Sequence, residues 1–241
     1  MNGWTPLHYA AKDGYSATCE LIINEVKDKN PKSESGLTPL HFAARNGQLS
    51  ICQLIVDNVQ DKNPKDKTGW TPLHYAARNG HISVCEFIVG KIDDMNTSNS
   101  SGDTPLHFAA EKGHFKICKQ IIEKIRTKNP ENDDGWTPLH YAARNGHFSV
   151  CEFIIGKIDD VNTSNSSGDT PLHFAAEKGH LKICKQSIEK ISAKNPENDD
   201  GWTPLHLAAQ NKHMELCKLI HDHIKNNDSR SNLNEDLSCI L

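Results

Sequence analysis

Residues 69–101 read GWTPLHYAARNGHISVCEFIVGKIDDMNTSNSS, and this stretch is one copy of a unit that fills most of the chain. Its central tetrapeptide, Thr-Pro-Leu-His, recurs every 33 residues, beginning at Thr5, Thr38, Thr71, Thr104, Thr137, Thr170 and Thr203. A glycine lies two residues before each threonine, and paired alanines follow in the same register. Seven copies without an insertion predict that every repeat builds the same supersecondary unit.

The repeat has the composition of a helical hairpin. Thr71 can cap a helix N-terminus, Pro72 suits the first helical position, and Gly80 can adopt the left-handed conformation that ends a helix, so the first helix is about two turns long. Apolar residues then fall at i, i+3, i+4 and i+7 of a second helix, at Cys85, Ile88, Val89 and Ile92. The segment DDMNTSNSSGD favours a tight turn, because Asn, Ser, Asp and Gly hydrogen-bond their own backbone or accept positive φ.

The period and the pattern G-x-TPLH-x-AA-x-x-G resemble the ankyrin repeat across residues 2–225. The resemblance implies an all-α ankyrin-repeat solenoid of stacked helix-turn-helix units with projecting β-turns, whose concave groove of turn tips and first helices usually binds proteins. The predicted repeats, of which the first and last are incomplete, are 1–32, 33–65, 66–98, 99–131, 132–164, 165–197 and 198–225. Residues 226–241 are expected to form a polar, disordered tail.

Two departures from the family pattern bear on the fold. Where most ankyrin repeats close the second helix with glycine, this chain has Val26, Val59, Ile92, Ile125, Ile158, Ile191 and Ile224. Because β-branched residues tolerate positive φ poorly, we expect the second helix to run further, except that Gly90 and Gly156 could loosen two of these helix ends. In the last repeat Lys212 replaces the glycine of the first helix, which suits a terminal repeat.

Two types of repeat alternate around this frame, and residues 71–136 are nearly identical to 137–202. One type has Trp before the threonine and Arg-Asn before the glycine, and the other has Asp and Glu-Lys. By the resemblance these variable sites face the groove, so the candidate partner-binding residues are Trp4, Trp70, Arg78, Asp103, Glu111, Trp136, Arg144, Asp169, Glu177 and Trp202. Either recent duplication or selection for a two-fold repeated partner explains the near identity.

The tryptophans have two interpretations. As rigid aromatic groups they could anchor a partner, since Trp and Arg are enriched among binding hot spots. Alternatively each Trp covers the neighbouring turn and stiffens the array, with Arg78 or Arg144 stacked over it as a cation–π pair.

The repeated cysteines and histidines are predicted to be structural. Seven of eight cysteines share one position on the apolar face of the second helix and are expected to be buried free thiols, too far apart for disulfides. Most of the fourteen histidines belong to TPLH or follow the first-helix glycine or its Lys212 replacement; in the resembling family the TPLH histidine links neighbouring turns. His221 and His223 have no nearby third ligand, so we expect no metal site and no cofactor.

Bulk composition narrows the function. The net charge of −4 is made of 27 basic and 31 acidic residues spread along the chain, which argues against a nucleic-acid partner. No apolar run is long enough to insert into a membrane, and the N-terminus lacks a signal peptide, so a cytoplasmic or nuclear location is expected. Because almost every polar residue recurs with the period and no catalytic motif is present, we expect a monomeric, non-enzymatic protein.

The sequence therefore predicts a protein–protein interaction scaffold that binds a partner protein in the concave groove. The alternative is the regulatory or targeting region of a larger enzyme, channel or receptor, suggested by Met1, which falls inside a turn and leaves the first repeat incomplete. A third hypothesis makes turn asparagines such as Asn63 and Asn96 substrates of an asparaginyl hydroxylase.

Overall fold

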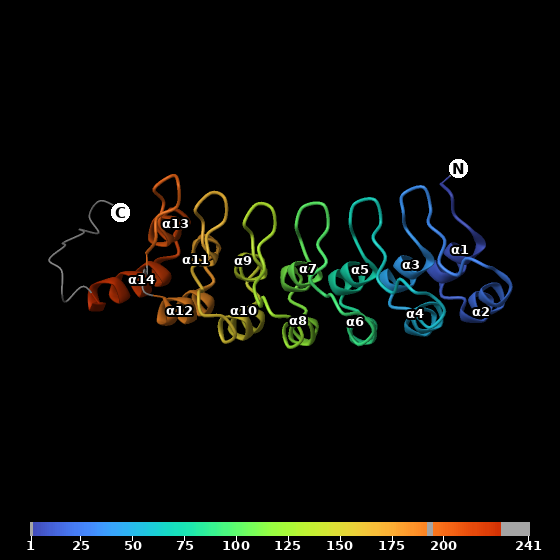
Figure 1. The fold of residues 1–241 in the computed structure, drawn as a ribbon. Coiled ribbons are helices and arrows are strands. Elements are labelled where there is room, and N and C mark those ends of the chain that lie inside the picture. The colour runs from blue at the N-terminus through green and yellow to red at the C-terminus, as the bar shows by residue number, and fades with distance from the viewer. Residues whose placement is uncertain (1, 192–194, 228–241) are drawn as a thin grey trace. The chain divides into compact units, whose positions relative to one another are not determined.

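The computed structural model describes residues 2–191 and 195–227, and within them the secondary structure consists of fourteen α-helices without strands. The helices belong to two compact units, residues 1–127 and 128–241, which are described separately. Each repeat forms one antiparallel hairpin of two helices, as predicted. Figure 1 shows that within each unit the first helices lie side by side, the second helices form a neighbouring row, and the connecting turns project from one edge.

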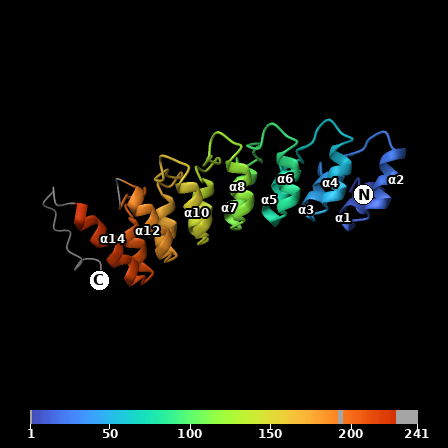
Figure 2. The ribbon, with the colours of Figure 1, turned by 90° about the horizontal axis from the view of Figure 1, so that it is seen from below.

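In the first unit the first helices are α1 (Pro6–Asp13), α3 (Pro39–Arg45), α5 (Pro72–Asn79) and α7 (Pro105–Glu111). Their partners are α2 (Ser16–Glu25), α4 (Leu49–Val56), α6 (Ile82–Val89) and α8 (Phe115–Ile122). In the second unit the hairpins pair α9 (Pro138–Arg144) with α10 (Phe148–Ile155), α11 (Pro171–Glu177) with α12 (Leu181–Lys190), and α13 (Pro204–Gln210) with α14 (Met214–Asn227). Figure 2 shows the second helices from below.

The first helices begin and end as their sequence predicts. Thr71 is the N-cap of α5, its Oγ1 accepts a hydrogen bond from the His74 amide at 3.4 Å, and Pro72 occupies the first turn. Gly80 ends the helix with a φ of +79°. In the last repeat Lys212 adopts the same conformation, with a φ of +60°, and is the one described non-glycine residue with a positive φ.

The second helices end earlier than predicted. Helix α6 stops at Val89, so Ile92 lies beyond the helix and not on its apolar face, and α4, α8 and α10 stop at the same point of their repeats. The last turn tightens to i→i−3 bonds, such as Lys91 N–H to the Ile88 carbonyl at 2.8 Å, which releases the chain into the turn. Gly90 is not the cause, because α4 and α8 end alike without glycine there. Among the described second helices, only α14 extends beyond the position that is usually glycine in ankyrin repeats, which in this helix is Ile224.

The core of each unit lies between the two rows of helices. The tetrapeptide leucines, the paired alanines and the second-helix cysteines are buried in successive repeats. The seven cysteines from Cys19 to Cys217 are free thiols, as predicted, and burial raises the pKa of Cys52 and Cys118 to about 12. The thiols of Cys52 and Cys118 are therefore protonated at neutral pH, and they behave as small apolar side chains.

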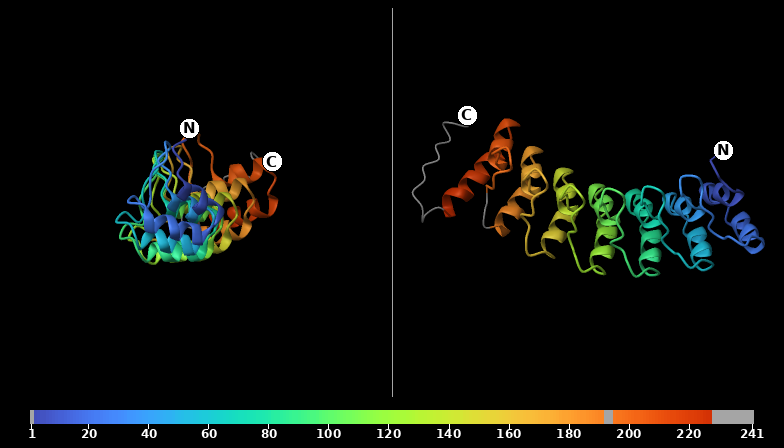
Figure 3. Two further views of the ribbon diagram at one scale, coloured as in Figure 1. Left: turned by 90° about the vertical axis from the view of Figure 1, so that its right-hand side faces the viewer. Right: turned by 45° about the horizontal axis from the view of Figure 1, so that its top comes forward.

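The projecting turns are fastened both internally and to one another. Asp66 Oδ1 accepts hydrogen bonds from the amides of Thr68 at 2.8 Å and Trp70 at 3.0 Å, and an asparagine does the same in later repeats, as Asn132 does. Neighbouring tips are joined by backbone bonds, such as Ser100 N–H to the Thr68 carbonyl at 3.0 Å. Gly69 makes this approach possible, because a Cβ there would lie 2.9 Å from Asn99 Cα. Figure 3 shows the turns in two further views.

The predicted tail lies almost wholly outside the described residues. Its first two residues, Asn226 and Asn227, form the end of α14. Cys239 lies outside the described residues as well.

Two glycines of the third repeat should respond oppositely to substitution. Gly90 has a helical φ of −77° and room for a Cβ, so Gly90→Ala should raise the free energy of unfolding by about 0.5–1 kcal/mol through loss of chain entropy in the unfolded state. Gly80→Ala should lower it by at least about 1 kcal/mol, since φ is positive and a Cβ would lie 2.7 Å from the His114 ring. Urea denaturation measures both. Equal effects would contradict the assignment of these helix ends.

Candidate functional site

The tetrapeptide histidines hold the candidate binding residues in place. His41 Nδ1 accepts the Thr38 backbone N–H at 3.0 Å, so its proton is on Nε2, which donates to the Trp70 carbonyl of the next repeat at 3.1 Å. The same link from one repeat to the next joins His8 to Leu37, His74 to Asp103, His140 to Asp169, and His173 to Trp202. The predicted link between turns is confirmed. The capping of the histidine's own helix was not anticipated, although T-x-x-H has the spacing of a capping box.

Burial favours the neutral form of four of these histidines. Burial lowers the pKa of His41 and His74 to about 4, and lowers that of His8 and His173 in the same direction. Protonation of Nδ1 would also remove the acceptor of the threonine N–H, because two hydrogen atoms would then face each other. The link between repeats therefore depends on the uncharged imidazole.

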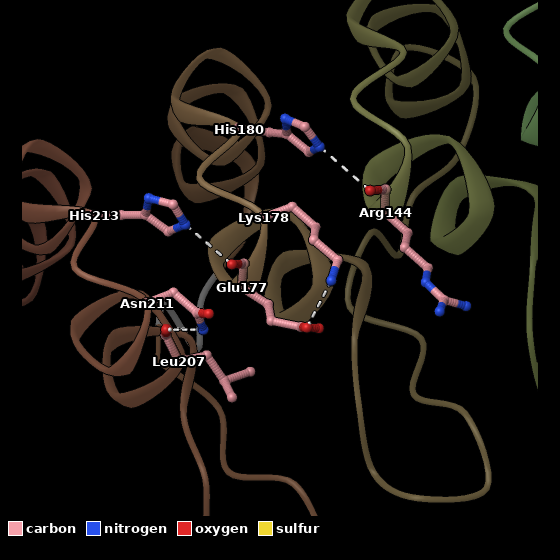
Figure 4. A network of polar contacts seen from close by, with 7 residues as sticks. All are labelled: Arg144, Glu177, Lys178, His180, Leu207, Asn211 and His213. Atoms are coloured by element: carbon pink, nitrogen blue, oxygen red, sulfur yellow. Dashed lines mark hydrogen bonds and ion pairs between the residues drawn. The ribbon is translucent and has the colours of Figure 1, made fainter.

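A second series of histidines connects the first helices. The Nε2 atom of His81 donates to the Arg45 carbonyl at 2.8 Å, and His114, His180 and His213 do the same toward Arg78, Arg144 and Glu177. Figure 4 shows that the His180 and His213 rings approach these carbonyls from one side, while the Arg144 and Glu177 side chains extend to the other. The backbone at the variable arginine and glutamate positions is thus fixed, and their side chains remain outside this network.

Each of the first three tryptophans lies in an aromatic stack that spans two repeats. The Trp70 ring centroid is 5.0 Å from Tyr75 of its own repeat and 4.3 Å from Phe108 of the next, and the Arg78 guanidinium lies 5.4 Å above it. Trp136 repeats this with Tyr141, Phe174 and Arg144, and Trp4 with Tyr9, Phe42 and Lys12. The cation–π pairs of the stiffening interpretation are therefore present. The tryptophans are half-buried and both arginines are exposed, which leaves them accessible to a partner.

The acidic candidates are less exposed than the arginines. Asp103 is 9% exposed, and its carbonyl accepts the bond from His74. Asp169 is half-buried, and its Oδ1 accepts a hydrogen bond from Asn198 Nδ2 at 2.7 Å. The carboxylates of Glu111 and Glu177 each lie 2.8 Å from the ammonium group of the adjacent lysine. The second repeat type therefore presents partly neutralised glutamates, and its aspartates contribute mainly to the turns.

A pocket of about 350 Å³ lies in the second unit between the sixth and seventh repeats. It brings together Asp169, Glu177 and Trp202 of the predicted set, and its other lining residues are His173, Phe174, Asn198, Asp200, Leu207 and Gln210. Trp202 is 39% exposed, because no phenylalanine from a following repeat covers it within the described residues. Sequence periodicity does not predict this pocket, because the pocket depends on how much of Trp202 stays exposed once the repeats have packed.

Other site chemistry is limited in the part of the chain that the structure describes. Among those residues, no group of three or more His, Cys, Asp or Glu side chains could hold a metal ion. No described helix has the length and apolar character required to cross a membrane.

The fold and this surface define a helical-repeat protein of stacked hairpins, fixed by neutral histidines. A family model for ankyrin repeats matches the chain in three copies, over residues 7–99, 88–165 and 157–232. The protein belongs to the ankyrin repeat family, whose members are typically non-catalytic and generally act as protein–protein interaction modules. The chain matches no curated protein at a significant level.

The neutral histidines predict acid sensitivity. Because their folded-state pKa is below the unfolded value of 6.5, the stability they contribute is complete above pH 6.5 and is lost as pH falls toward 4. His41 and His74 should each lower the free energy of unfolding at pH 5 by about 2 kcal/mol relative to its value at pH 7.5. Urea denaturation at both pH values measures this loss. A His74→Gln variant should lose less between the two values, and an unchanged pH dependence would contradict the role of His74.

The aromatic stacks predict unequal costs for two tryptophan substitutions. Trp136→Ala removes contacts with Tyr141, Phe174 and Arg144 and should lower the free energy of unfolding by about 3 kcal/mol. Trp202→Ala should cost only about 1 kcal/mol, because that ring is 39% exposed and no described phenylalanine packs on it as Phe174 packs on Trp136. Chemical denaturation of the two variants compares them. Equal losses of unfolding free energy in the two variants would show that the contact between Trp136 and Phe174 contributes little to stability.

Proposed function

We propose that this protein is a scaffold that binds a partner protein in the groove lined by its turns and first helices. The contact residues proposed for the first unit are Trp4, Trp70 and Arg78, with Asp103 and Glu111 beside them. In the second unit they are Trp136, Arg144, Asp169, Glu177 and Trp202. The general role of ankyrin repeats supports the class of function, and the exposure of the arginines supports the choice of surface.

The observation that carries the proposal is the pocket between the sixth and seventh repeats. It combines a partly exposed Trp202 with Asp169 and Glu177, which come from a different repeat. A concave site with an aromatic wall and a few polar groups is the usual form of a recognition pocket. Large aromatic side chains at such positions commonly supply much of the binding energy.

The remaining properties in this proposal follow from the composition and the core. We propose a monomer without cofactor or catalytic activity, and no nucleic-acid partner. A cytoplasmic location is supported by the seven buried free thiols, because a reducing compartment keeps such thiols unpaired; a nuclear location is compatible with them too.

The alternative function, as a regulatory region of a larger enzyme, channel or receptor, is favoured by one feature of the first repeat. An apolar pocket of about 570 Å³ opens between α1 and α2, and Leu21 beside it is 70% exposed. The equivalent Leu54 of the second repeat is only partly exposed. An open reading frame that continues beyond residues 1 and 241 would favour this alternative over the scaffold.

Charge reversal tests the proposed surface without removing core contacts. Arg78→Glu with Arg144→Glu replaces two exposed cations that lie above tryptophans, so capture of a partner by the full chain should fall at least tenfold. The matched control is Lys116→Glu with Lys182→Glu, which makes the same charge change at exposed positions of α8 and α12. Quantitative affinity pull-down measures both. Equal losses, or none in the arginine variant, would place the binding surface elsewhere.

A further inference from the structure

The tryptophan of every second repeat is accompanied by a cation in the first three instances. Lys12 lies 5.7 Å above Trp4, Arg78 lies 5.4 Å above Trp70, and Arg144 lies 5.5 Å above Trp136. In each case the cation is eight residues after the tryptophan, near the end of the same first helix. The end of the first helix therefore positions a positively charged side chain above the indole ring in these three repeats.

The fourth tryptophan has no such partner in its own repeat. Gln210 occupies the place of Arg144, and Leu207 replaces Tyr141. Trp202 is 39% exposed, and among the described residues no phenylalanine covers its ring as Phe174 covers Trp136. Within the described residues, the seventh repeat therefore has the tryptophan of the stack but lacks both the cation above the ring and the phenylalanine that covers it.

The pocket beside Trp202 is acidic. Asp169, Glu177 and Asp200 line it, and the lining includes no lysine or arginine. Burial lowers the pKa of His173, so this wall of the pocket adds no positive charge at neutral pH. Lys178 pairs with Glu177 at 2.8 Å, but both side chains are more than one third exposed, and such an exposed pair is weak enough to exchange partners.

We infer that this pocket binds the guanidinium group of an arginine from the partner protein, stacked on Trp202 and paired with Glu177 and Asp200. The inference rests on the proposed function, because it assigns the chemistry of the partner at one end of the same surface. Arginine fits better than lysine, since a planar guanidinium both stacks on an aromatic face and forms paired hydrogen bonds with a carboxylate. The volume of about 350 Å³ lies at the lower end of the usual range for ligand pockets and suits a single side chain.

The direct test is a titration of the full 241-residue chain, observed through the indole N–H signal of Trp202 in nuclear magnetic resonance spectra. The signal is assigned by its loss in Trp202→Phe. The probe is the blocked peptide Gly-Ser-Arg-Ser-Gly, and its counterpart with citrulline keeps the shape of arginine without the charge. We expect a saturable shift of the Trp202 signal, with about tenfold weaker binding of the citrulline peptide. Equal binding of the two peptides, or no shift at Trp202, would overturn the inference.

A variant that fills the site from within gives an independent test. Gln210→Arg places a guanidinium at the position that Arg144 occupies in the fifth repeat, so it should compete for the ring and weaken arginine-peptide binding about tenfold. Gln53→Arg makes the same charge change at an exposed position of α4 and should leave binding unchanged. Equal affinity of the wild type and Gln210→Arg would show that the peptide does not use the face of Trp202.

The outcomes separate this inference from the proposed function. If the full chain captures a partner through Arg78 and Arg144 but the arginine peptide does not shift Trp202, the pocket assignment fails and the scaffold function stands. If the peptide binds at Trp202 while charge reversal of Arg78 and Arg144 leaves capture unchanged, the pocket stands and the wider surface fails.

Discussion

Neutral tetrapeptide histidines such as His41 hold successive repeats together. One ring accepts the N–H of the residue that caps its own helix and donates to a carbonyl in the next repeat, so it fixes the start of a helix and the distance between two turns together. A hydrogen bond of this kind contributes about 1 kcal/mol. Loss of the imidazole lowers the free energy of unfolding by more than this, because a buried carbonyl and a buried amide are then left without hydrogen-bond partners.

Stacking imposes a second constraint at the opposite end of the first helix. In the second repeat a Cβ on Gly47 would lie 2.6 Å from the His81 ring, so glycine is required there by its neighbour as well as by its positive φ. In the last repeat Lys212 occupies the equivalent position with a φ of +60°. At the tip of the projecting turn, a Cβ on Gly201 would meet no described atom within 4 Å, whereas one on Gly69 or Gly135 would lie 2.9–3.0 Å from the next turn.

The last tryptophan differs from the others in its surroundings within the described residues. Trp70 and Trp136 lie under a phenylalanine of the following repeat and an arginine of their own, so they stabilise the stack and expose only part of the ring. Trp202 has the same backbone link, from His173, but its ring borders a pocket. The stiffening contacts are thus made by Trp70 and Trp136, whereas the ring of Trp202 lines a pocket.

The helical hairpin of each repeat is predictable from the sequence, because helix caps, positive-φ glycines and apolar periodicity are properties of residues close together in the chain. Thr71, Pro72 and Gly80 behave as their chemistry predicts, and the cysteines are buried as their shared position indicates. The end of α6 at Val89 was beyond local reasoning, since the apolar pattern continues to Ile92 while the backbone tightens into the turn. The accessibility of the candidate residues could not be predicted in this way, because it depends on packing between repeats: Asp103 is 9% exposed and Trp202 is 39% exposed. The physical reason is that identical residues in successive repeats differ in exposure according to whether another repeat packs against them.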